Sequence, residues 1–160
     1  MEKNIINWKI KEINGFYDVI SIDSLEFIDK ILKQLKLPLN NGNSGLYKQD
    51  TAINWSKMPQ YYKLFFDEPG WEKRITNFFI ESELKNTSHL IITYGKNEPV
   101  IKIPTKLFID DWEGFIRSTL WESFIFSEDY KLIMEISRDY CLHSNFRIVP
   151  KKYEKELDCD

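Results

Sequence analysis

The spacing of apolar residues predicts a helix early in the chain. Leucine and isoleucine recur at intervals of three and four positions, which is typical of one face of an amphipathic helix. These apolar positions are Leu25, Ile28, Ile31, Leu32 and Leu35. Asp23 stands three residues before Glu26, the spacing of a capping box, and Pro38 ends the pattern. We therefore expect a helix over residues 24–36 that buries all five apolar side chains.

Two further helices are expected downstream. Asp110 and Glu113 repeat the capping-box spacing, and a helix over residues 111–119 should follow. The inward positions of that helix are Trp112, Phe115, Ile116 and Leu120. Residues 59–65 also fit a short helix, because proline is well placed in a first helical turn.

The remaining apolar segments predict strands. Residues 8–13 and 16–22 flank Asn14-Gly15, a strong hairpin signal because both residues tolerate a positive φ. Further strands are expected at residues 75–84, 90–94, 100–103, 124–126, 131–137 and 145–149. In the hairpin formed by 124–126 and 131–137, one face should hold Leu132, Met134 and Ile136.

This order of elements predicts an α+β fold. Short turns join neighbouring strands, so we expect a mostly antiparallel sheet with two or three helices packed on one face. The chain of 160 residues has the size of one ordinary domain and contains no internal repeat. We expect a single domain over residues 1–150, followed by a charged, frayed tail over residues 151–160.

Composition excludes several classes of protein. The chain has 22 Lys and Arg against 25 Asp and Glu, a net charge of −3, so a general basic footprint for nucleic acid is absent. Two cysteines, Cys141 and Cys159, are too few for a disulfide framework and fit free thiols in a reducing cytosol. No signal peptide and no apolar run of membrane-spanning length are visible. With its abundant Asn, Lys and Ile, the chain is expected to be a bacterial, cytoplasmic protein that binds neither nucleic acid nor a membrane.

The sequence shows no pattern for a cofactor or a metal. Its six glycines form neither a dinucleotide-binding loop nor a P-loop, and His89 and His143 lie 54 positions apart. Candidates for an unrecognised catalytic site are Glu81, Glu83, Glu135, Cys141 and His143. A thiol and an imidazole two positions apart can meet on a strand, and paired carboxylates can act as acid and base. Ordinary surface or half-buried roles explain these residues more simply, so we expect no catalysis, no cofactor and no metal.

Charge is distributed unevenly along the chain. Residues 67–140 carry nine basic and fourteen acidic side chains, a net charge of −5, and would attract a basic surface. Acids in loops and at helix starts are not committed to a sheet, and tryptophans near turns can anchor a partner. The residues expected to contact a partner are Asp67, Glu68, Trp71, Glu72, Asp111 and Trp55. Asp110 is expected to act as a helix cap instead.

Two stretches resemble a known class of proteins. Residues 99–116 are a strand leading into a helix that holds Phe108, Trp112 and Phe115, and residues 124–136 complete the run. Together they resemble the small cytosolic immunity proteins of bacterial contact-dependent-inhibition and type VI secretion systems. The resemblance implies a non-catalytic α+β domain that binds a cognate toxin domain tightly, often with acidic residues facing a basic cleft. The alternatives are an adaptor with an unknown partner and an enzyme with an unrecognised site.

Histidine and cysteine spacing makes metal dependence testable. Because the two histidines and two cysteines lack ligand spacing, dialysis against a chelator should leave the melting temperature unchanged. A fall of many degrees after dialysis, reversed by adding back a divalent metal, would contradict this expectation.

Overall fold

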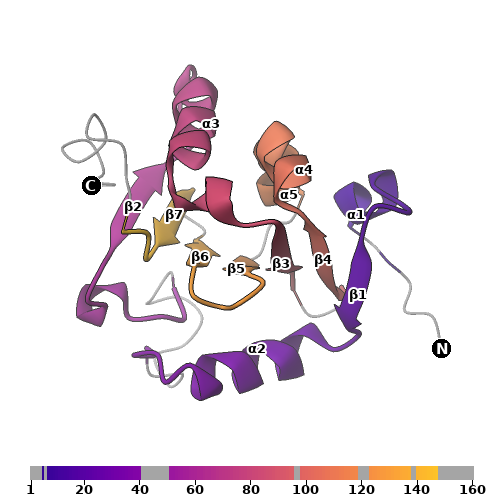
Figure 1. Cartoon of the computed structure of the whole chain (residues 1–160). Helices are drawn as coiled ribbons and strands as arrows, with labels where there is room; N and C mark the ends of the chain where they lie inside the picture. Colours follow the sequence, from indigo (N-terminus) through magenta and orange to yellow (C-terminus); the bar gives the residue numbers. More distant parts are fainter. Residues whose placement is uncertain are drawn as a thin grey trace.

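The computed structural model describes residues 5, 7–40, 51–95, 98–118, 123–137 and 140–147. These residues form a seven-stranded sheet with helices on both of its faces (Figure 1). The helices are α1 (Trp8–Glu12), α2 (Ser24–Gln34), α3 (Trp71–Glu81), α4 (Thr105–Asp110) and α5 (Trp112–Arg117), with 3₁₀ turns η2 (Trp55–Lys57) and η3 (Glu83–Asn86). The strands are β1 (Asp18–Ser21), β2 (Tyr62–Phe65), β3 (His89–Thr93), β4 (Val100–Pro104), β5 (Ser123–Ser127), β6 (Ile133–Ile136) and β7 (Cys141–Ser144). The expected tail at 151–160, Cys159 and Leu120 lie outside the described residues.

All neighbouring strands in the sheet are antiparallel, in the order β1-β4-β3-β5-β6-β7-β2. Three pairs of successive strands, β3 with β4, β5 with β6 and β6 with β7, lie beside each other, as short connections allow. The two strands from the first half of the chain, β1 and β2, lie at opposite ends of the sheet. The α+β class and the antiparallel sheet are confirmed.

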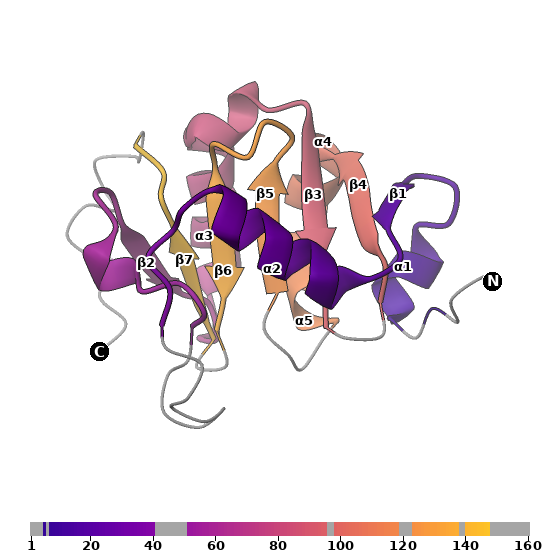
Figure 2. The same ribbon diagram turned by 90° about the horizontal axis from the view of Figure 1, so that it is seen from below.

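Helices cover both faces of the sheet, so the expectation of helices on one face is wrong. One face packs Leu90, Ile92 and Ile125 against the layer that contains α1, α3, α4 and α5. The other packs Ile91 and Phe126 against Ile31 and Leu32 of α2, which crosses that face in Figure 2. Strands β3 and β5 carry consecutive apolar residues, and such runs are typical of strands buried on both sides.

Helix α2 is confirmed, and it starts as the sequence predicts. The side chain of Asp23 accepts a hydrogen bond from the N–H of Glu26 at 3.0 Å. Ile31 and Leu32 are buried, and the other inward positions are partly buried with the exception of Leu25, which is 55% exposed. Figure 2 shows the first turn of α2 near β1 and β4, where the sheet ends, so Leu25 has little to pack against.

Two segments expected to be strands are helices. Residues 8–12 form α1, with Ile13 at its C-terminal cap, because the Asn7 side chain accepts from the N–H groups of Lys9 and Ile10 and caps the start of the helix. The Asn14-Gly15 turn therefore follows a helix, and the predicted hairpin is wrong. Residues 75–84 fall largely in α3, whose buried positions are Ile75, Phe78 and Phe79. Their spacing of three and four is helical, and it outweighs the partial alternation.

Three further expectations need correction. Residues 59–65 contain strand β2 and no helix, since that segment pairs with β7. The last strand is Cys141–Ser144, inside the sheet between β6 and β2, and the described residues 145–147 are not in a strand. The helix expected at 111–119 is confirmed as α5, but its cap is Asp111 and not the expected Asp110, since the side chain of Asp111 accepts from the N–H of Gly114. A separate short helix, α4, precedes it and is not among the expected helices.

The strands at 90–94, 100–103, 124–126 and 131–137 are confirmed within one or two residues. As predicted, Leu132, Met134 and Ile136 share one face and contact the same apolar cluster. None of the helices in the described part of the chain is long and apolar enough to cross a membrane.

The contrast between two leucines of α2 tests its placement. Leu32→Ala should lower the free energy of unfolding by roughly 2–5 kcal/mol, because it opens a cavity against the sheet. Leu25→Ala deletes the same atoms from the same helix, and it should cost less than about 0.5 kcal/mol because Leu25 is exposed. Chemical denaturation of both variants makes the comparison. Equal losses would show that α2 packs differently.

Candidate functional site

Glu135 is a buried carboxylate in the middle of strand β6. Its side chain is fully buried and accepts hydrogen bonds from the N–H groups of Ala52 at 2.7 Å and Ile53 at 3.2 Å. The indole N–H of Trp55 donates a third bond, at 2.9 Å. A buried charge is tolerated only where donors replace water, and these three donors supply that compensation. Glu135 thus fastens residues 52–55 to the sheet.

His143 lies beside Glu135 on β7, directly opposite it in the strand register. Its ring stacks with Trp55 at 5.9 Å and with Tyr61 at 5.8 Å between ring centroids. Both ring nitrogens reach hydroxyl groups at 2.9 Å, Nδ1 that of Tyr61 and Nε2 that of Ser137. The imidazole is therefore enclosed and held on both sides.

These contacts bear on the residues that could have formed a catalytic site. Cys141 is 1% exposed, so its thiol lies away from solvent, and the nearby imidazole binds hydroxyls through both nitrogens. Glu81 ends α3 and Glu83 begins η3, so they do not share a strand face. Glu83 accepts a hydrogen bond from the backbone N–H of Arg147. Over the described part of the chain, no three His, Cys, Asp or Glu side chains gather as a metal site.

A groove with an acidic lining runs between α3 and the pair α4–α5. It has a volume of about 320 Å³. The residues that line it are Glu72, Thr76, Ile80, Ile109, Asp110, Asp111, Trp112 and Glu113. Four of these lining residues are acidic and none is Lys or Arg. The indole N–H of Trp112 donates to the hydroxyl of Thr76 at 2.8 Å, which ties α5 to α3 across the groove.

Basic side chains outside the lining hold three of these carboxylates. Lys106 binds Asp110 at 2.6 Å, and Arg117 binds Glu113 at 3.1 Å. Asp111 caps α5 and pairs with Lys9, which lies over the ring of Phe115. These ion pairs orient the carboxylates, and exposed pairs of this kind contribute little stability.

Lys9 is a buried lysine that secures α1 to α5. Its amine pairs with Asp111 and, at 2.8 Å, with Glu12. Burial lowers the pKa of Lys9, but the hydrogen bonds and negative charges of Asp111 and Glu12 outweigh burial and raise it above its ordinary value. The ammonium therefore stays charged at neutral pH and keeps a cation next to Asp111 of the groove.

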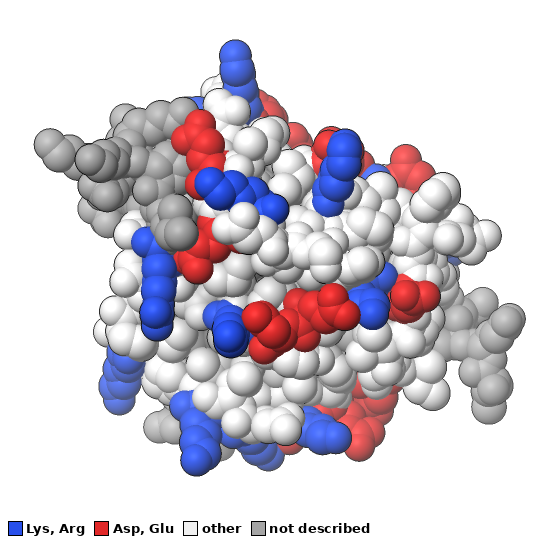
Figure 3. Space-filling view, in the orientation of Figure 1, with Lys and Arg blue, Asp and Glu red and all other residues white. Residues whose placement is uncertain are grey.

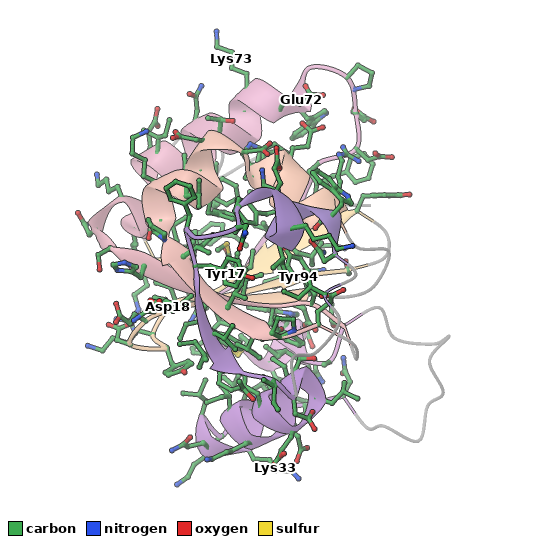
Figure 4. The ribbon with its side chains drawn as sticks, turned by 90° about the vertical axis from the view of Figure 1, so that its right-hand side faces the viewer. Tyr17, Asp18, Lys33, Glu72, Lys73 and Tyr94 are labelled. Atoms are coloured by element: carbon green, nitrogen blue, oxygen red, sulfur yellow. The ribbon has the colours of Figure 1, made fainter. Side chains whose placement is uncertain are left out.

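The structure brings together two of the six residues expected to bind a partner. Glu72, an exposed residue in the first turn of α3, lines the groove together with Asp111. Figure 4 shows Glu72 and Lys73 on α3, at the opposite end of the molecule from Lys33 of α2. The groove therefore belongs to the helical layer that covers the face of the sheet opposite α2.

Three of the other expected residues, Asp67, Glu68 and Trp71, lie near the start of α3, and Arg117 joins Asp67 to Glu113 of the groove. Asp67 pairs with Arg117 at 2.9 Å, and the carboxylate of Glu68 accepts from the indole N–H of Trp71 at 2.9 Å. The guanidinium of Arg74 lies 4.2 Å from the centre of the Trp71 ring. Trp71 is half-buried and Glu68 is exposed, so both remain accessible to a partner.

The structure overturns the expectation that Trp55 contacts a partner. Its side chain is 3% exposed and binds the buried carboxylate of Glu135, so it cannot serve as a surface anchor. Sequence reasoning also missed the groove residues Ile80, Ile109 and Glu113 and treated Asp110 only as a cap. The signal that could have found the α3 wall is the spacing of Glu72, Thr76 and Ile80, which fall on one face of a helix.

Charge on the face seen in Figure 3 is mixed, with acidic and basic side chains interspersed. An acidic lining is therefore a property of the groove and does not extend over that whole face. No protein-family model matches the chain, and no curated protein matches it.

Two Glu–Trp pairs of equal length allow a matched test of the buried carboxylate. Glu135→Gln should lower the free energy of unfolding by about 2–4 kcal/mol, because the amide cannot accept from all three N–H donors. Glu68→Gln weakens an exposed indole bond of the same 2.9 Å length and should change stability by less than about 0.5 kcal/mol. Equal effects in denaturation would contradict a structural role for Glu135.

Proposed function

We propose that this protein is a non-catalytic binding protein that neutralises a cognate bacterial toxin domain by tight association. The observation that carries the proposal is the groove between α3 and α4–α5, whose lining holds four acidic and no basic side chains. Such a groove complements a basic surface, and toxins that act on nucleic acid expose one. The resemblance of residues 99–116 and 124–136 to immunity proteins supports the same function.

The lining of the groove suits a long cationic side chain. Ile80, Ile109 and Trp112 offer apolar contact to the methylene stem of a lysine or arginine. Glu72 offers its carboxylate to the charged head, where charge-assisted hydrogen bonds are strong, and Glu113 would share its carboxylate between that head and Arg117. The volume of about 320 Å³ admits side chains of a partner, at the low end of the range of ligand pockets.

The buried polar residues favour binding over catalysis. Glu135 and His143 are the groups best suited to acid–base chemistry, and both are enclosed and hydrogen-bonded to the surrounding fold. The accessible acidic residues of the groove are instead oriented by ion pairs and by a helix cap. Surface acids held in this way serve recognition, which is the role that an immunity protein needs.

Neutralisation is tested by growth rescue. The candidate toxin is the domain encoded by the neighbouring reading frame, produced from an inducible promoter with and without this protein. Rescue of growth together with co-purification of the two chains is the expected result. Co-purification without protection from any toxicity would favour the adaptor alternative over the immunity function.

Charge reversal in the groove tests the binding surface. Glu72→Lys should slow association with the toxin domain several-fold, and the rate should fall about tenfold between roughly 0.02 M and 0.15 M salt. Asp29→Lys is the matched control, because it reverses an exposed acid on α2, on the opposite side of the sheet. Stopped-flow fluorescence measures the rates. An association rate that changes neither with salt nor with Glu72→Lys would show that the toxin domain binds outside the groove.

A further inference from the structure

Strand β1 is an edge strand surrounded by exposed apolar side chains. It lies at one end of the sheet and pairs with β4 (Figure 1). The exposed apolar residues in and around it are Phe16, Val19, Ile20, Ile22 and Leu25, with Phe16 70% and Ile22 62% exposed. Isolated exposed leucines are ordinary, but five exposed apolar residues within ten positions mark this edge as a candidate interaction surface.

The backbone of β1 also has polar groups that a partner could bind. An edge strand presents N–H and C=O groups on its outer side, and an extended chain satisfies them by adding a strand. Natural edges are protected by lysine, proline or other charges, by bulges or by being short. Residues 16–26 contain no lysine or proline, and the protection of β1 comes from its length of four residues, from Asp18 and from a register shift. The register with β4 shifts between Val19 and Ser21, so the available ladder is short. The groups on this edge therefore fit a short extended segment.

The charged residues around β1 favour a partner segment of a particular charge. Residues 16–26 contain three acids, Asp18, Asp23 and Glu26, and no Lys or Arg. All three acids are exposed, including Asp23, which caps α2. A second copy of this chain, paired edge to edge, would bring these acids near their own counterparts, which is unfavourable. A partner with lysine or arginine between its apolar residues would meet them favourably.

We propose that the β1 edge binds an extended segment of a partner protein that alternates apolar and basic side chains. The segment adds an eighth strand next to β1, places its apolar residues against Val19, Ile20 and Ile22, and pairs its basic residues with Asp18 and Asp23. This surface is separate from the acidic groove: in Figure 4, Asp18 and Glu72 lie on different parts of the molecule. The inference therefore stands or falls independently of the toxin assignment.

The test uses the full chain and two synthetic hexapeptides. The basic probe alternates lysine with valine, and the acidic control alternates glutamate with valine. Backbone amide NMR shifts should move at residues 16–23 with the basic peptide, and hydrogen exchange of the β1 amides should slow. The acidic peptide should bind about tenfold more weakly, because the same ladder would place carboxylates beside Asp18.

Two variants distinguish binding at the β1 edge from nonspecific apolar binding elsewhere on the surface. Phe16→Ser combined with Val19→Thr removes apolar surface beside and within β1, while threonine keeps the strand position, and the double variant should bind the basic peptide several-fold more weakly. Leu39→Ser removes an exposed leucine away from the edge and should leave binding unchanged. Equal binding of both peptides, or shifts outside residues 16–23, would overturn the proposal. Sedimentation showing a dimer with protected β1 amides would assign the edge to a second copy and overturn it as well.

Discussion

The carboxylate of Glu135 points from β6 into the layer that covers one face of the sheet, where Ala52, Ile53 and Trp55 donate hydrogen bonds to it. The segment that carries these donors pairs with the residues that follow α2, through the bridge between Leu39 and Ile53. Because α2 packs in the same apolar cluster as Trp55 and Ile53, the hydrogen bonds of one buried side chain link the sheet, the segment and the helix. A charge in that position is stable only while all its donors stay in place, so the position of the layer depends on it.

This arrangement divides the molecule into a structural side and an accessible side. On the face covered by α2, the polar residues Glu135 and His143 are committed to holding Trp55 and Tyr61. On the opposite face, the helices α3, α4 and α5 leave an acidic groove open at the surface. Glu135 and His143, which are candidates for catalysis in the sequence, therefore support the fold. In the groove, the groups available to a partner are surface carboxylates, most of them oriented by neighbouring cations.

The sequence predicted elements whose signals are local. Helix α2 and the strands at 90–94 and 100–103 follow from spacing within a few residues, and all three are confirmed. Sequence-based prediction failed where the position of a residue depends on a contact with a residue far away in the chain. Trp55 reads as exposed beside polar neighbours, but its partner Glu135 lies 80 positions away. In α3 the adjacent Phe78 and Phe79 partly resemble the alternation of a strand, and their burial, that of Phe79 against Phe108 and Trp112, shows that the spacing of three and four is the one that matters.

Native-state hydrogen exchange at the amides of Ala52 and Ile53 tests the role of Glu135 most directly. If the carboxylate holds the segment, these two amides should exchange only when the whole domain unfolds, as slowly as core amides of β3 and β5. Exchange on the timescale of exposed loop amides, while the sheet remains protected, would show that the segment opens on its own and that Glu135 does not secure it.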